Sequence, residues 1–206
     1  MKKDRLDKQL EFILAIDKEK NIFRQTYVSD ASRMENDAEH AWHMAVMCMI
    51  LSEYAEHPID KLKTMTMLLI HDLVEIYAGD TYAYAGVDAE EIHQREYAAA
   101  EKLYGMLPEE QGIYFMNLWK EFEEGKSPEA QFARTMDRIQ PMMLNAATDG
   151  RAWKEHKVRL SQIMKRNEHT AEGSSVLWDY ALKHFVMPHV ESGEIIDDET
   201  HSTGLK

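Results

Sequence analysis

The segment Met65-Thr-Met-Leu-Leu-Ile-His-Asp-Leu-Val-Glu-Ile-Tyr-Ala-Gly79 guides the interpretation of the rest of this chain. It is a mostly apolar stretch of the kind found in a buried helix, yet His71 and Asp72 stand side by side within it. Burying an imidazole and a carboxylate is costly unless another group pairs with them. A divalent cation would do so, because neutral imidazoles and carboxylates are ligands for ions of intermediate hardness. The segment therefore predicts a helix that carries part of a metal site, which needs at least two more ligands from elsewhere.

Two other residues are the best candidates to complete this metal site. His40 ends the string Glu35-Asn-Asp-Ala-Glu-His40, and Asp137 lies within Ala133-Arg-Thr-Met-Asp137-Arg-Ile-Gln-Pro141. Asn36 has the form of a helix N-cap followed by Glu39 at the third helical position, which places His40 in the first turn. The helix dipole disfavours a protonated imidazole there, so a ligand nitrogen stays free.

Composition favours one helical domain spanning residues 1–206. The chain has 206 residues, enough to bury a core, and its 9 Gly and 5 Pro are too few for a turn-rich all-β protein. Helices are expected at about residues 4–17, 36–55, 61–78, 88–104, 108–123, from 128 past Asp137 to about 145, 153–166 and 174–184. Pro141 should bend its helix and help to aim Asp137. We expect residues 18–36 to form a loop and residues 191–206 a frayed tail, in an all-α bundle of seven or eight helices.

Charge and cysteine content exclude several classes of function. A formal net charge of −13 argues against binding a nucleic-acid polymer, whose phosphates are held mostly by clustered Lys and Arg. No apolar run approaches the ~18 residues of a membrane span, and the N-terminal segment lacks the apolar region of a signal peptide. The single cysteine, Cys48, allows no disulfide framework, which fits a cytoplasmic protein.

The set His40, His71-Asp72 and Asp137 resembles the metal site of HD-domain phosphohydrolases. The longer strings Glu-Asn-Asp-Ala-Glu-His-Ala-Trp-His and Leu-Leu-Ile-His-Asp-Leu-Val-Glu-Ile-Tyr-Ala-Gly-Asp are similar to those of the 5'-deoxynucleotidase branch. The resemblance covers roughly residues 20–185. It implies an HD helical bundle that binds one divalent cation through these four side chains, with Mn, Co, Fe, Zn and Ni all chemically suitable.

The same resemblance implies a reaction, the hydrolysis of the 5'-phosphate of deoxyribonucleoside monophosphates. Glu75 would carry the proton and Asp80 would orient water or a sugar hydroxyl, or the two roles are exchanged. Arg24 or Arg33 would grip the substrate phosphate. In the better-known nucleotidase pattern an Arg-Trp pair precedes the ligand His at a fixed interval. This chain has Arg24-Gln25 instead, and Arg24 is one residue out of register. Phe23 or Tyr27 would therefore have to replace the aromatic ring of that Trp.

Two other functions remain open on the sequence. One is another HD activity, on a phosphodiester or alarmone nucleotide, although a binuclear phosphodiesterase would want extra inward histidines and only His43 and His93 are suitably placed. The other is a non-enzymatic interaction module that a metal ties together.

A homodimer is expected, because the resemblance implies one and because the helix at residues 111–122 is apolar on more than one side. Its aromatic residues, Trp119 among them, would either anchor the dimer or make this a central core helix.

The loop at residues 81–87 could cover the metal site.

Overall fold

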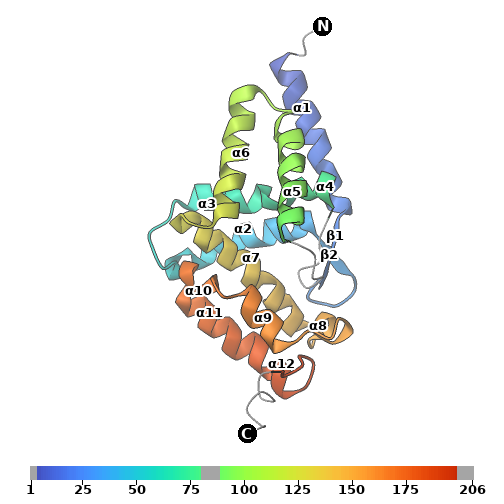
Figure 1. Cartoon of the computed structure of the whole chain (residues 1–206), viewed down its shortest axis with the longest axis vertical. Coiled ribbons are helices and arrows are strands. Elements are labelled where there is room, and N and C mark those ends of the chain that lie inside the picture. Colours follow the sequence, from blue (N-terminus) through green and yellow to red (C-terminus); the bar gives the residue numbers. More distant parts are fainter. Residues whose placement is uncertain (1–3, 80–88, 199–206) are drawn as a thin grey trace.

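The computed structural model describes residues 4–79 and 89–198, and helices make up most of these ranges (Figure 1). The described elements, in which η marks short 3-10 or π segments, are in order α1 (Arg5–Ile16), η1 (Asp17–Asn21), β1 (Phe23–Tyr27), β2 (Met34–Asn36), α2 (Asp37–Leu51), η2 (Ser52–Tyr54), α3 (Lys61–Ile70), η3 (His71–Val74), α4 (Glu75–Ala78), α5 (Ala89–Tyr104), α6 (Glu109–Glu124), α7 (Pro128–Ala147), α8 (Arg151–Glu155), α9 (Leu160–Arg166), α10 (Thr170–Gly173), α11 (Ser175–Ala181), η4 (Leu182–Val186) and α12 (Met187–Glu191). The helical fold class is thus confirmed. The described ranges hold more helices than the seven or eight expected, because tight turns divide several of them; α8 and α9 replace the single helix expected at residues 153–166.

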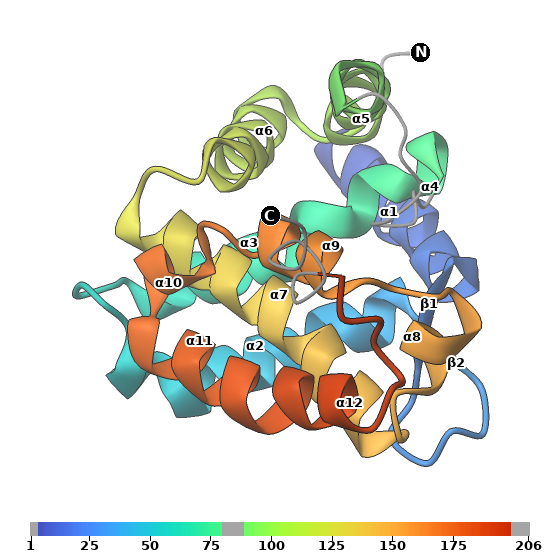
Figure 2. The same ribbon diagram turned by 60° about the horizontal axis from the view of Figure 1, so that its bottom comes forward.

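Helix α7 crosses the middle of the molecule and organises the core. It packs against α2, α3 and α6 on one side and against α10 and α11 on another (Figures 1 and 2). The Ser127 side chain accepts a hydrogen bond from the backbone N–H of Ala130, and Pro128 follows in the first turn, as expected. The helix continues through Pro141. Asp137 lies in its middle, between the buried residues Met136 and Ile139. The bend expected at Pro141 remains a prediction.

The helix that carries His71 is not continuous. The α-helical part α3 ends at Ile70 and passes into the tighter 3-10 segment η3. The carbonyl of Ile70 accepts a hydrogen bond of 2.9 Å from the buried Tyr104 hydroxyl, which satisfies this carbonyl at the transition. In a continuous α-helix, His71 and Glu75, four residues apart, would share one face. Because residues three apart align in a 3-10 helix, Glu75 instead follows the side of Asp72.

Gly79 ends this segment, as the sequence predicts. Its φ of 78° lies in the left-handed region that glycine adopts without strain, and its N–H bonds the Glu75 carbonyl at 2.7 Å.

A short antiparallel hairpin replaces the loop expected before α2. Strands β1 and β2 pair with an irregular register, Phe23 facing Asn36 and Tyr27 facing Met34. The prediction failed because these strands are short and lack an alternating apolar pattern. The hairpin is important for the site, since it carries Arg24 and leads directly into α2.

The C-terminal tail is ordered as far as it is described, contrary to our expectation for residues 191–206. The side chain of Ile195 is buried, and the backbone of Ile196 forms hydrogen bonds of 2.9 Å with Val158 and Leu160. The apolar pair Ile195-Ile196 was the signal missed, because the side chain of Ile195 joins the core while the backbone of Ile196 pairs with the chain ahead of α9. Residues 199–206 lie outside the described residues.

Helix α6 is buried along one side and exposed along the other. Leu118, Trp119 and Phe122 belong to the core, whereas Ile113 and Tyr114 are about half exposed. Trp119 is therefore a core residue, and it cannot anchor a dimer in this fold.

Within the described ranges, no helix combines the length and apolarity needed to cross a membrane.

Candidate metal centre

The four side chains proposed as metal ligands meet in the interior. His40 comes from the first turn of α2, His71 and Asp72 from η3, and Asp137 from α7. His40 Nε2 lies 3.2 Å and His71 Nε2 3.9 Å from Oδ1 of Asp137, and His71 Nε2 lies 3.1 Å from Oδ1 of Asp72. His40, His71 and Asp72 each offer an atom within 4.8 Å of the others. A cation placed among these atoms could contact all four side chains.

The position of His40 follows from local structure. The Asn36 side chain accepts a hydrogen bond from the Glu39 backbone, and the Glu39 side chain accepts one from the Asn36 backbone, so the expected capping box is present. This box fixes the first turn of α2, and His40 is fully buried in it.

His71 is oriented so that one ring nitrogen faces the cluster as an acceptor. Its Nδ1 lies 3.0 Å from the backbone carbonyl of Leu68, and a carbonyl only accepts, so Nδ1 must donate. When the ring is neutral, Nε2 therefore carries a lone pair. This Nε2 is buried and makes no well-formed hydrogen bond within the described residues, although Oδ1 of Asp72 lies 3.1 Å away. A buried acceptor of this kind beside two carboxylates fits a metal ligand.

Buried acidic groups dominate the electrostatics around these ligands. Burial, followed by the charges of Asp72 and Asp37, raises the pKa of Glu19 to about 7. Burial also raises the pKa of Asp37 to about 6, against the lowering effects of Arg24 and of a hydrogen bond with Glu75. Negative charge is thus in excess in this part of the interior, which favours binding of a cation.

Without a cation, protons partly compensate this charge. Burial lowers the pKa of His71, but the adjacent Asp72 carboxylate outweighs it and raises the pKa to about 9. Burial and Arg24 likewise lower the pKa of His40, yet hydrogen bonds with Asp137 and Glu35 leave it raised. A metal ion bound at these imidazoles would displace the protons, so metal affinity must fall with decreasing pH.

The two candidate arginines have different surroundings. Arg24, on β1, places Nη1 2.7 Å from Oδ2 of Asp72 and 3.2 Å from Oδ1 of Asp37, so the structure brings it to the cluster. Arg33 lies in the hairpin turn and holds the Glu39 carboxylate with both Nη atoms at 2.7 Å. Its guanidinium is thus paired with the start of α2 and lies away from the cluster, whereas Arg24 lies at the cluster.

Of the two candidate proton-handling residues, Glu75 lies at this site, where it influences both Asp37 and Arg24. Asp80 and the loop at 81–87 lie outside the described residues.

Sequence reasoning missed several buried polar residues around the cluster. Asp37, Glu35 and Gln140 are at most 3% exposed, and Glu19 is 8% exposed. Gln140 Oε1 lies 2.9 Å from Nδ1 of His40. Two signals could have found them: Glu35 and Asp37 belong to the string that ends in His40, and Gln140 follows Asp137 by three residues on the same helix.

Comparisons with known proteins agree with this geometry. A family model described as HD domain matches residues 16–178. The human 5'-deoxynucleotidase HDDC2 is 30% identical over 139 residues, which is 67% of this chain and 66% of the human protein. The HDDC2 of Dictyostelium discoideum is 32% identical over 143 residues, 66% of this chain and 75% of that protein. The alignment with the human relative thus spans just under two thirds of its length.

A solved structure is similar over nearly the whole chain. It is a predicted metal-dependent phosphohydrolase from Magnetospirillum magnetotacticum MS-1, 41% identical, with a TM-score of 0.87 and coverage of 93% of this chain and 95% of that one. The two proteins are therefore similar in sequence as well as in the arrangement of their helices.

The raised pKa of Glu19 gives a testable pH dependence of stability. The folded protein holds this proton up to about pH 7, whereas an unfolded Glu releases it near 4.5, so rising pH through this window destabilises the fold. In metal-stripped protein, Glu19→Gln should raise the free energy of unfolding at pH 8 by up to about 3 kcal/mol, and by little at pH 4. Urea unfolding at both pH values measures this. The same change at exposed Glu53 should have no such effect, and equal gains at both pH values would contradict the electrostatic cause.

Proposed function

Because this chain belongs to the HD domain family, we propose that it is a metal-dependent phosphohydrolase that removes the 5'-phosphate from deoxyribonucleoside monophosphates. The observation that carries the proposal is the buried cluster of two imidazoles and two carboxylates, with the lone pair of His71 Nε2 facing it. The substrate class rests on the curated relatives, which are 5'-deoxynucleotidases.

His40, His71, Asp72 and Asp137 would hold one divalent cation. Two nitrogen and two oxygen donors suit Mn, Co, Fe, Zn or Ni, and the affinity order alone does not choose among them. When bound, the cation supplies Lewis acidity toward a phosphoryl oxygen and acidifies a water. A closed structural site would more often be rich in Cys, whereas Cys48 is buried elsewhere in the core.

Arg24 would bind the substrate phosphate next to this cation. Its Nη1 is held by Asp37 and Asp72, while its buried Nε has no hydrogen-bond partner among the described residues. A phosphate oxygen would satisfy this donor, and a guanidinium suits the spacing of phosphate oxygens. Asp37 and Asp72 hold the guanidinium in place, so little side-chain entropy would be lost on binding.

For contact with the sugar, we favour Phe23 of the two aromatic candidates on β1. The Tyr27 hydroxyl donates to Glu155 at 3.0 Å, and Arg151 lies 4.0 Å over its ring, so Tyr27 is fixed against α8. Phe23 is 52% exposed and free to lie against a substrate. We propose that Phe23, in place of the missing Trp, contributes to discrimination between deoxyribose and ribose.

Glu75 would transfer the proton. It follows the side of Asp72 at the end of the 3-10 segment, and its interactions reach Asp37 and Arg24, which touches Asp72. A carboxylate in this place can take a proton from the attacking water and pass it to the leaving sugar oxygen. Asp80 stays the second candidate for that role or for orienting the water.

The alternative of a binuclear phosphodiesterase receives less support. Among the described residues, one group of three metal-type side chains is close enough to share an ion. His93 stacks on Trp119 with ring centroids 6.3 Å apart, and Nδ1 of His43 lies 3.2 Å from Nε2 of Gln140. These contacts give both extra histidines packing and hydrogen-bonding roles.

The proposal extends to a cytoplasmic homodimer. One buried free cysteine suits a reducing compartment. For the interface we propose the outer stripe of α1, where Leu6, Leu10, Ile13 and Leu14 are 55–75% exposed. These residues recur at helical spacing opposite the buried Phe12, and an exposed aliphatic stripe of this kind marks an association surface.

Metal binding is tested by elemental analysis of protein purified without added metal. We expect about one transition-metal ion per chain in the wild type and a large loss in Asp72→Ala, because the carboxylate supplies a ligand oxygen. Asp179→Ala, at an exposed position on α11, is the matched control and should keep its metal. Full metal content in Asp72→Ala would remove Asp72 from the ligand set.

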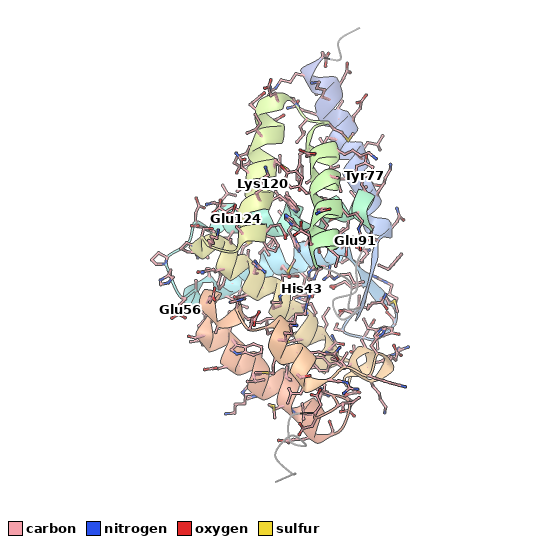
Figure 3. All side chains as sticks on the ribbon, in the orientation of Figure 1. His43, Glu56, Tyr77, Glu91, Lys120 and Glu124 are labelled. Carbon is pink, nitrogen blue, oxygen red and sulfur yellow. The ribbon has the colours of Figure 1, made fainter. Side chains whose placement is uncertain are left out.

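Activity is tested by a phosphate-release screen of deoxyribonucleoside and ribonucleoside 5'-monophosphates, cyclic nucleotides and alarmones with Mn, Co, Ni, Zn and Fe. We expect release from the deoxyribonucleoside monophosphates, and a turnover lowered about 100-fold or more in Glu75→Gln, with metal content unchanged. Glu124→Gln, at the exposed end of α6 (Figure 3), is the control. Release from none of these compounds would favour the interaction module, and wild-type turnover in Glu75→Gln would exclude its proton role.

The dimer is tested by light scattering at micromolar concentration. Leu10→Glu should shift the mass from twice 24.0 kDa toward 24.0 kDa, because it places a charge in the apolar stripe. Leu62→Glu on α3 changes a leucine that lies outside the stripe and is more exposed than Leu10, 74% against 55%, and it should leave the dimer intact. A wild-type mass of one chain would refute the dimer, and a dimeric Leu10→Glu protein would place the interface elsewhere.

A further inference from the structure

Gln140 is a fully buried amide at the edge of the metal centre. It lies on α7 three residues after Asp137, so the two side chains project from neighbouring positions on one side of the helix. A buried amide is costly unless each of its polar atoms is paired. Its partners therefore show what this position is built to hold.

Each polar atom of the Gln140 amide has a partner. Oε1 lies 2.9 Å from Nδ1 of His40, while Nε2 lies 2.7 Å from Oε1 of Glu35 and 3.2 Å from Nδ1 of His43 (His43 is labelled near the middle of Figure 3). The nitrogen of an amide donates two hydrogen bonds, and its oxygen only accepts. Because the buried Glu35 carboxylate accepts, it fixes Nε2 on its own side and turns Oε1 toward His40.

This orientation decides which nitrogen of His40 carries hydrogen. Oε1 of Gln140 can only accept, so Nδ1 of His40 must donate. Without a metal, Nε2 also carries a proton, which it donates to the Asp137 carboxylate 3.2 Å away. Because Gln140 holds the hydrogen on Nδ1, loss of this second proton to an incoming cation leaves the lone pair on Nε2, on the side of the metal cluster. A ring of the opposite tautomer would direct an N–H at the cluster and could not bind a cation there.

We propose that Gln140, held by Glu35, is a positioning residue that sets the tautomer and ring orientation of the metal ligand His40. This inference rests on the proposed metal-dependent function. Glu35 acts through Gln140 and also directly, since its Oε2 lies 3.6 Å from Nδ1 of His40, and Gln140 acts through His40. Partners of this kind orient metal-bound imidazoles, and their loss lowers metal affinity about 10- to 100-fold.

The test is calorimetric titration of metal-stripped protein with Mn²⁺ and with Co²⁺, without substrate. Gln140→Met keeps the volume and removes the acceptor, so affinity should fall about 10- to 100-fold. Glu35→Gln still offers an oxygen to Nε2 and should stay close to the wild type, whereas Glu35→Leu should lower affinity. Combining Glu35→Leu with Gln140→Met should add little to the loss from Gln140→Met alone, because both act on one ring.

The control is Thr135→Val, which removes another fully buried polar group from α7. The Thr135 hydroxyl lies away from the metal cluster and donates to the backbone carbonyls of Gln131 and Thr170. Urea unfolding of each metal-free variant measures general destabilisation. Wild-type affinity in Gln140→Met, or an equal loss of affinity in Thr135→Val, would overturn the proposal. Should Gln140→Met not fold, Glu35→Leu tests the same coupling without changing α7, and unchanged affinity there overturns it too.

The outcome is separable from that of the proposed function. A wild-type protein that binds neither ion would overturn the positioning role together with the metal centre. A wild type that binds metal and shows the expected loss in Gln140→Met, but releases phosphate from no nucleotide, would support the positioning role and refute the proposed reaction.

Discussion

Buried negative charge is the constraint on which the interior of this protein depends. Glu19, Glu35, Asp37, Asp72, Glu75 and Asp137 surround two imidazoles, and Arg24 and Arg138 pair with some of these acids. Taking so many carboxylates out of water is tolerable only with compensating cations or protons. The raised pKa values of Glu19, Asp37 and His71 all express this one imbalance. A divalent ion would relieve it at the point where the lone pairs converge.

The helical scaffold holds this charge in place from several directions. The capping box fixes the first turn of α2, the Tyr104 hydroxyl satisfies the last carbonyl of α3, and α7 supplies Asp137 and Gln140 from one side. These contacts join segments that are far apart in the chain, so the site and the core are stabilised together. Burial against Phe122, whose ring centroid lies 4.8 Å from that of His71, also keeps water from part of the site.

Much of this arrangement could be predicted from the sequence because the signals are local. The caps at Asn36 and Ser127, the stop at Gly79 and the helical spacing of apolar residues each depend on a few neighbouring residues. Family resemblance then supplied the ligand set, which the structure brings together.

What could not be predicted depends on contacts between distant residues. The 3-10 turn at His71 involves Tyr104 on another helix, and the order of the tail depends on burial of Ile195 and on backbone hydrogen bonds of Ile196 with Val158 and Leu160. The hairpin has too weak a pattern to be seen without its partner strand. Gln140 looks like any helical glutamine until His40 and Glu35 are placed next to it, 100 and 105 residues away in the chain.

The hairpin separates two tasks that an enzyme must often change independently. The proposed ligands lie on core elements, where substitutions disturb packing, whereas Arg24 and Phe23 lie on a two-stranded ribbon that Arg151 and Glu155 hold from outside through Tyr27. Divergence at the exposed Phe23 and in the hairpin turn could alter which sugar or base the proposed reaction accepts, while Arg24 and the proposed ligands stay in place. Evolution of substrate range within such a lineage would therefore concentrate in the exposed positions of residues 22–34, ahead of Glu35 and of the helix that carries His40.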